Sequence, residues 1–195
     1  MSHTHTFVQD DLAITSNHVN ATRTFSPPIF GRWHGSSRLD IDARMPSDVE
    51  IISPMVEQLM QAIEASGCVI GREFAVELAL REALNNAVLH GNRLDPAKFV
   101  ELHCRCDLRK GIWLVIKDEG TGFDPTTVPN PMRPDGLKAE HGRGIYLMKS
   151  TMDDVSFERG GTEVHMWKRS GWSSSRELLG DKTCAEKENV TDLRR

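Results

Sequence analysis

A carboxylate and an amide lie one helical turn apart in the segment Glu82–Ala87, and two glycine-containing turns follow further along the chain. The first turn is Asp118–Gly122 (sequence DEGTG), and the second is His141–Ile145 (sequence HGRGI). A carboxylate can act as a general base, an amide oxygen can bind Mg²⁺, and glycine turns can direct backbone N–H groups at phosphates. In this order, the three segments predict a site for Mg²⁺ and ATP with a base beside it.

Glu82 and Asn86 lie at the edge of the apolar arc of their helix. At about 100° per residue, the solvated arc holds Glu77, Arg81 and Asn85 instead. Burying a carboxylate and an amide without partners is costly, and a bound metal nucleotide would remove that cost. Asn86 can offer an oxygen to Mg²⁺, and Glu82 can take a proton from a hydroxyl or water near the phosphate. A structural polar pair is the alternative interpretation.

Asp118 ends an apolar run and is followed by Gly120 and Gly122. A short carboxylate at the end of a strand can accept a hydrogen bond from an exocyclic amine such as that of adenine. The two glycines let the backbone turn sharply and approach the ring. An ordinary Asp-Gly turn is the alternative interpretation.

The segment Gly142–Ile145 (sequence GRGI) precedes a predicted short helix. Its glycines leave backbone N–H groups available to phosphates at a helix N-terminus, and Arg143 can add a charge-assisted contact. It is not a P-loop, because the Gly-Lys-Ser/Thr ending is absent. It is not a dinucleotide fingerprint, because a third glycine and a strand directly before it are absent. A loop that needs flexible residues is the alternative interpretation.

Hydrophobic periodicity predicts the elements that position these motifs. Ser47 is expected to cap the first helix, and the segregation of strands from helices favours an α+β fold, a mixed sheet with helices on one face. Residues 124–140 are rich in proline, and a loop of that length predicts a lid. We expect strands over residues 37–43, 99–108, 112–117, 155–159 and 162–168, helices over 47–66, 71–90 and 144–152, and flexible tails over 1–36 and 170–195 around one domain at 37–169.

The composition argues against several classes of protein. The net charge is −4, and no segment concentrates Lys and Arg as a nucleic-acid-binding protein would. No run of about 18 apolar residues is present, and the N-terminus lacks the pattern of a signal peptide. We expect a cytoplasmic protein that does not contact nucleic acid or membrane directly.

The four cysteines, Cys68, Cys104, Cys106 and Cys184, show no metal-binding spacing. Cys104 and Cys106 would point to the same face of one strand, too close for a normal disulfide between them. We expect buried thiols in a reducing cytosol.

The three motifs together resemble those of the histidine-kinase-like ATPases, the GHKL or Bergerat-fold superfamily. Within it, the chain is most similar to the anti-sigma-factor serine/threonine protein kinases, over about residues 37–168. The resemblance implies a Bergerat ATP-binding fold, with a mixed, mainly antiparallel sheet covered on one face by helices. It also implies that Glu82 is the catalytic base and Asn86 the Mg²⁺ ligand.

The resemblance extends these roles to the nucleotide and to the partners. It implies ATP and Mg²⁺ as cofactors, a sigma factor and a small antagonist protein as partners, and a homodimer. Thr162 is expected to assist at the adenine end. The residues that it assigns to ATP binding are Asn86, Asp118, Gly120, Gly122, Gly142, Arg143, Gly144, Ile145 and Thr162.

The leading hypothesis is an enzyme that transfers the γ-phosphoryl group of ATP to a Ser or Thr of the antagonist and also sequesters the sigma factor. One alternative is a non-catalytic ATP-binding module that only sequesters a partner, although such a module has no need of a base at Glu82. The other alternative is a histidine-kinase-type catalytic domain that works in trans, because residues 1–36 show no heptads for a phosphoacceptor helix.

Overall fold

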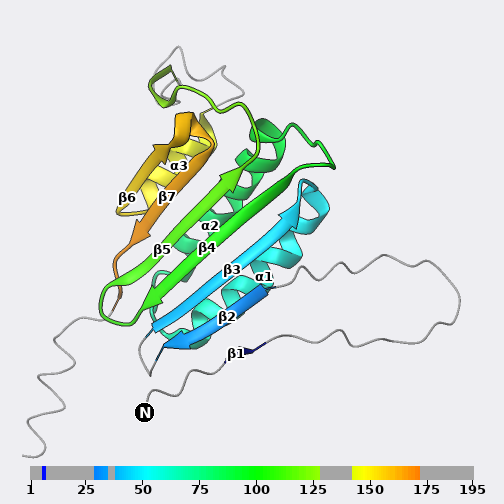
Figure 1. Ribbon diagram of the computed structural model, residues 1–195. Helices are drawn as coiled ribbons and strands as arrows, with labels where there is room; N and C mark the ends of the chain where they lie inside the picture. The colour runs from blue at the N-terminus through cyan, green and yellow to red at the C-terminus, as the bar shows by residue number, and fades with distance from the viewer. Residues whose placement is uncertain (1–5, 8–28, 35–37, 128–141, 172–195) are drawn as a thin grey trace, which may run out of the picture.

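The computed structural model describes residues 6–7, 29–34, 38–127 and 142–171, and it places them in two layers (Figure 1). One layer is a sheet, and the other consists of helices that cover one face of it. The predicted α+β two-layer class is confirmed. The strands are β1 (Thr6–Phe7), β2 (Ile29–His34), β3 (Arg38–Pro46), β4 (Phe99–Asp107), β5 (Gly111–Asp118), β6 (Asp154–Glu158) and β7 (Glu163–Lys168), and the helices are α1 (Val49–Ser66), α2 (Glu73–Asn85) and α3 (Arg143–Thr151).

The strand order in the sheet is β1-β2-β3-β4-β5-β7-β6. Every strand pairing among the described residues is antiparallel, so the sheet there contains none of the parallel pairing that a mixed sheet would have. The sequence analysis also did not expect β1 and β2, which lie within residues 1–36; β2 pairs with β3, and β1 pairs with β2. Pro27, Pro28 and Gly31 obscured the strand pattern there, although Ile, Phe and Trp favour strands.

The core lies between the sheet and the helices. Side chains along β3 and β4 alternate between buried and more exposed positions, because successive residues of a strand point to opposite faces. The apolar sides of α1 and α2 pack on the buried face. The largest fully buried side chains are Leu39, Ile41, Met45, Met55, Leu59, Ile63, Leu80, Leu84, Leu102, Ile112, Leu114 and Ile116.

The cap of the first helix lies one residue later than predicted. Asp48, not Ser47, is the N-cap of α1, and its carboxylate accepts a hydrogen bond of 2.9 Å from the N–H of Glu50. Ser47 is instead held by its backbone N–H, which donates to the carbonyl of Lys98. The prediction of Ser47 as cap is therefore wrong. Both residue types are good caps, so their order alone could not decide between them.

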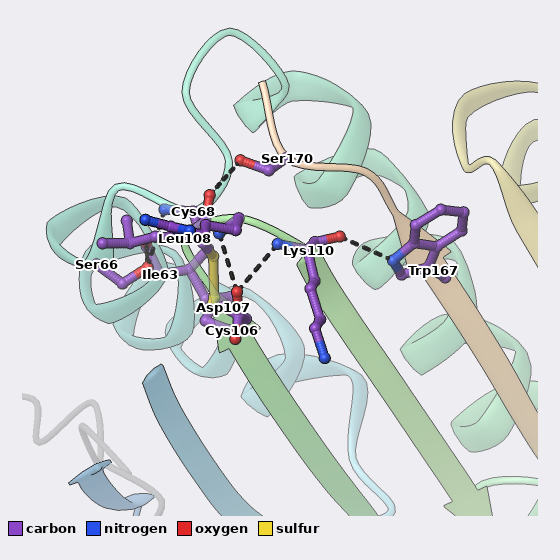
Figure 2. The surroundings of a disulfide bond; sticks show 10 residues. Ile63, Ser66, Cys68, Cys106, Asp107, Leu108, Lys110, Trp167 and Ser170 are labelled. Carbon is purple, nitrogen blue, oxygen red and sulfur yellow. Dashed lines mark hydrogen bonds between the residues drawn. A yellow bond between two sulfur atoms is a disulfide. The ribbon is translucent and has the colours of Figure 1, made fainter. Parts of the chain in front are cut away.

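A disulfide joins Cys68, just after α1, to Cys106, near the end of β4 (Figure 2). The bond closes a loop with a sequence separation of 38 residues, and the Cα atoms are 5.9 Å apart. The expectation of reduced thiols is therefore wrong for this pair. Cys104 is a free, buried thiol on the same strand face as Cys106, as predicted, and burial raises its pKa. Cys184 lies outside the described residues.

Residues 128–141, most of the predicted lid, lie outside the described residues, as does the predicted C-terminal tail from residue 172 onward. The first part of the lid, Pro125–Thr127, forms a short 3₁₀ turn. Within the ranges that the structure covers, no helix has the length and apolar character needed to cross a membrane.

Candidate functional site

The end of α2 continues directly into a π-helical segment, η1 (Asn86–Gly91). The N–H of Asn92 donates to the carbonyl of Ala87 at 2.8 Å, five residues back, which is the hydrogen bond of a π turn. The continuous helix confirms the predicted span to about residue 90. Its widened last turn begins at Asn86, and π turns within helices occur often at functional sites.

A cavity of about 860 Å³ opens between this helix end, the end of β5, the start of α3 and the start of β7. Nine of the ten residues that the sequence analysis proposed for the site line it. They are Glu82, Asn86, Asp118, Gly122, Gly142, Arg143, Gly144, Ile145 and Thr162.

Glu82, Asn86 and Gly144 meet at one side of this cavity. A Cβ atom added at Gly144 would lie 2.7 Å from Oε2 of Glu82 and 3.3 Å from the side-chain amide of Asn86. Only a glycine lets the first turn of α3 approach the carboxylate and the amide this closely. Two motifs that are about sixty residues apart in the sequence therefore form one surface.

The amide of Asn86 has an unsatisfied hydrogen-bonding capacity. Its Nδ2 atom is buried and finds no hydrogen-bond partner among the described residues. A buried polar atom without a partner is costly, and the two ends of an amide can be exchanged by rotation, so its oxygen can equally face the cavity. Mg²⁺ binds oxygen donors such as this amide, often with a carboxylate nearby. The donors present at Asn86 and Glu82 therefore fit a metal-bound nucleotide.

The start of α3 brings backbone N–H groups and a cation to the cavity. Gly142 precedes the helix with a φ of 107°, a left-handed conformation that favours glycine. Its carbonyl accepts the N–H of Tyr146, which closes the first turn. The first-turn N–H groups lack helical acceptors, and the exposed Arg143 adds a positive charge. This end of the cavity can therefore bind an anion.

Asp118 lines the cavity beside Gly91, at the end of η1, and is half-buried. Its N–H donates to the carbonyl of Thr162 at 3.0 Å, and its Oδ1 accepts the N–H of Gly120 at 2.8 Å. Burial raises the pKa of Asp118, while the N–H of Gly120 and the charge of Lys98 partly oppose that rise. A carboxylate held this way can accept a hydrogen bond from a ligand at the end of β5.

The glycines around Asp118 serve close packing. Gly120 is not among the residues that line the cavity, and a Cβ on it would collide with the carbonyl of Gly91. Gly91 itself leaves no room for a Cβ, which would lie 2.6 Å from both carboxylate oxygens of Asp118. Gly122 has a φ of 75° and does line the cavity. The close backbone approach that the sequence predicted at Gly120 is therefore to the end of η1 and not to a ligand ring.

Sequence reasoning missed the apolar wall of the cavity. Phe123 and Phe157 pack edge to face, with ring centroids 5.3 Å apart, and both line the cavity. An apolar wall of this kind suits a flat aromatic ring of a ligand. Phe123 follows Gly122 in a loop and Phe157 is one residue of a strand, so no sequence spacing linked them.

Sequence reasoning also treated Gly91 and Asn92 only as a stop signal for the helix. In the structure Asn92 is fully buried, and its side-chain oxygen accepts the N–H of Glu119 at 2.8 Å. A stop signal does not reveal whether its asparagine is exposed or buried, so the sequence held no sign of this contact.

Comparisons with known proteins place these observations in a family context. Residues 45–168 match the family model described as "Histidine kinase-like ATPase domain", a range that contains all of the site residues described above. The chain is also similar to proteins described as "Serine-protein kinase RsbW" from Staphylococcus aureus strains bovine RF122 / ET3-1 and MRSA252. Each is 27% identical over 137 residues, which is 66% of this chain and 85% of the relative.

Proposed function

The chain belongs to the histidine kinase-like ATPase family, and from that premise we propose that it is an ATP-dependent serine/threonine protein kinase that acts as an anti-sigma factor. The observation that carries the proposal is the buried, unpartnered amide of Asn86 beside the carboxylate of Glu82 and the first turn of α3. A purely structural pair would leave that amide without compensation, whereas a metal nucleotide would satisfy it.

At the adenine end, the carboxylate of Asp118 would accept a hydrogen bond from the exocyclic amine of the base. Phe123 and Phe157 would contact the ring and exclude water from one side of it. Thr162 lines the same end, and its hydroxyl donates to the carbonyl of Arg159 at 3.1 Å. Thr162 would therefore assist mainly through its backbone carbonyl, which holds Asp118 in place.

At the phosphate end, the first-turn N–H groups of α3 and the guanidinium of Arg143 would bind the phosphate oxygens. Asn86 would hold Mg²⁺, which, when bound, supplies positive charge at the phosphates. Gly142 and Gly144 allow the backbone to approach this closely.

Glu82 would accept the proton of the substrate hydroxyl. As the hydroxyl oxygen forms its bond to the γ-phosphorus of ATP, the bond between that phosphorus and the β–γ bridging oxygen breaks, and ADP leaves. The role of Gly144 would be to keep α3 close enough that the phosphate lies next to this carboxylate.

The Staphylococcus relatives are described as serine-protein kinases, which supports a serine or threonine acceptor. We propose that the acceptor is a small antagonist protein, that the protein sequesters a sigma factor without touching nucleic acid, and that it works as a homodimer in the cytoplasm. We take residues 37–169 as its ATPase domain, to whose sheet β1 and β2 add two further strands.

The test begins with calorimetry of the full chain with ATP, with and without Mg²⁺. We expect binding that is tighter with Mg²⁺, followed by transfer of radiolabelled phosphate to a protein that co-purifies from the native host. Absence of ATP binding at millimolar concentration would overturn the whole proposal. Binding without transfer to any co-purified partner would overturn the kinase and leave a sequestering module.

A further inference from the structure

We propose that Asn92 is a positioning residue that holds Asp118 in place for a purine bearing an exocyclic amine, and so determines the preference for ATP. The inference rests on the proposed nucleotide site and adds a residue to it. Asn92 is not among the residues that line the cavity, so it would act only through its neighbours.

Asn92 links three parts of the chain. Its side chain is buried, with 1% of its surface exposed. Its backbone N–H donates to the carbonyl of Ala87 and closes the π turn at the end of the helix. Its Oδ1 accepts the N–H of Glu119 at 2.8 Å, and its Nδ2 donates to the carbonyl of Phe99 at 2.9 Å. One side chain therefore ties the helix end to the start of β4 and to the residue after Asp118.

The two side-chain bonds also fix which way the amide points. Rotation of the amide by 180° would place its N–H groups against the N–H of Glu119 and its oxygen against the carbonyl of Phe99. Glu119 completes the network, because its carboxylate accepts the N–H of Phe99 at 2.9 Å. Asn92, Phe99 and Glu119 thus form a closed set of three hydrogen bonds.

This set determines where the carboxylate of Asp118 lies. The N–H of Asp118 is held by the carbonyl of Thr162, and the N–H of the next residue is held by Asn92. The neighbouring Gly91 packs directly against the carboxylate itself. The backbone on one side of Asp118 is therefore fixed by the residue just before β7, and on the other side by Asn92 at the end of the helix.

A general structural role and a positioning role for Asn92 predict different results. Loss of a buried hydrogen bond that only stabilises the fold would weaken the binding of all nucleotides alike. Displacement of the Asp118 carboxylate would weaken the binding only of those nucleotides whose base carries an exocyclic amine. The comparison of ATP with purine riboside triphosphate, which lacks the 6-amino group, separates these two effects.

The experiment measures the dissociation constants of both nucleotides, with Mg²⁺, for the wild-type chain and for Asn92→Ala. We expect the wild type to prefer ATP by roughly 10-fold or more, as for a hydrogen bond to a charged group. Asn92→Ala should lose most of that preference. Its affinity for ATP should fall, whereas its affinity for the analogue should change by less than about 3-fold. Ser170→Ala is the matched control, because it removes another buried hydrogen bond, to the carbonyl of Leu108, far from the cavity.

A second variant, Glu119→Ala, removes the hydrogen bond between the carboxylate of Glu119 and the N–H of Phe99. Because the side chain of Glu119 is 46% exposed, this variant is expected to fold even if Asn92→Ala does not. It should reduce the ATP preference in the same direction by a smaller factor. If every variant that folds keeps the wild-type preference for ATP over the analogue, the proposed role of Asn92 is overturned, while the proposed kinase function still stands. A wild-type chain that binds neither nucleotide would instead overturn the proposed function, and the role of Asn92 with it.

Discussion

Gly144 at the start of α3 lies against the carboxylate of Glu82 near the end of α2, at a separation where an added Cβ would come within 2.7 Å of Oε2. The contact joins the helix that would carry the base to the helix that would bind the phosphates. In the proposed site, the packing of these two helices would therefore set the distance between the base and the phosphate. A single methyl group at residue 144 tests this relationship.

Gly144→Ala should displace the carboxylate of Glu82 or the first turn of α3, and phosphoryl transfer should fall by roughly 10²-fold, as for a displacement of about 1 Å in an active site. Thermal unfolding should change little, because alanine favours helix. Lys149→Ala is the control, since it changes an exposed side chain of the same helix that does not line the cavity. Equal transfer rates for Gly144→Ala and the wild type would contradict the proposed role of this contact.

Substitutions at Glu82 and at Asn86 should affect phosphoryl transfer and ATP binding differently. Glu82→Gln keeps the shape of the side chain but removes the base, so transfer should fall by about 10²–10⁴-fold while the Kd for ATP stays within a few-fold. Asn86→Ala should instead weaken the binding of ATP with Mg²⁺ and lower transfer with it. The measurements are calorimetry and transfer of radiolabelled phosphate. Full activity of Glu82→Gln would assign the base to another residue.

If Asp118 accepts a hydrogen bond from adenine, as proposed, the binding of ATP should depend on pH through its carboxyl group. Burial raises the pKa of its carboxyl, so on acidification the acceptor is protonated, and affinity is lost, at a higher pH than for an ordinary aspartate. Asp118→Asn should bind ATP about 10- to 100-fold more weakly at neutral pH and should lack this loss. Titration of the Kd against pH in both proteins removes the contribution of the phosphates, which is common to the two. Parallel curves would show that Asp118 does not contact the base.

The Cys68–Cys106 disulfide should stabilise the fold without affecting the chemistry. A cross-link that closes a loop of this length contributes up to about 4 kcal/mol by loop-closure entropy, so the double variant Cys68→Ala/Cys106→Ala should unfold roughly 10 °C lower. Cys104→Ala is the control for loss of a buried sulfur atom. Similar melting temperatures for the double variant and the control, under oxidising conditions, would show that the cross-link does not contribute.

Periodicity predicted the three helices and five of the strands, because each of those elements shows an apolar pattern within its own residues. It did not give the partners of Asn92, which lie 7 and 27 residues away, or the partner of Cys68, 38 residues away. Contacts of this kind depend on how elements pack, which no local pattern encodes. The roles of Glu82, Asn86 and Arg143 stay predictions, since their placement around one cavity is compatible with the proposed chemistry but does not test it.

The cross-link and the Asn92 network hold opposite ends of one helix to the same sheet. Cys68 is bonded to β4 shortly before α2 begins, and Asn92 is bonded to β4 and to the residue after β5 where η1 ends. From Glu73 to Gly91 the helix is about 28 Å long at 1.5 Å per residue, and it is linked to the sheet near both of its ends. We expect α3, which packs against α2 and β6 and carries neither of these two links, to move more readily than this helix when a nucleotide enters or leaves. One wall of the cavity is thus held to the sheet at both of its ends, whereas the wall formed by α3 is joined to the sheet by neither of these links.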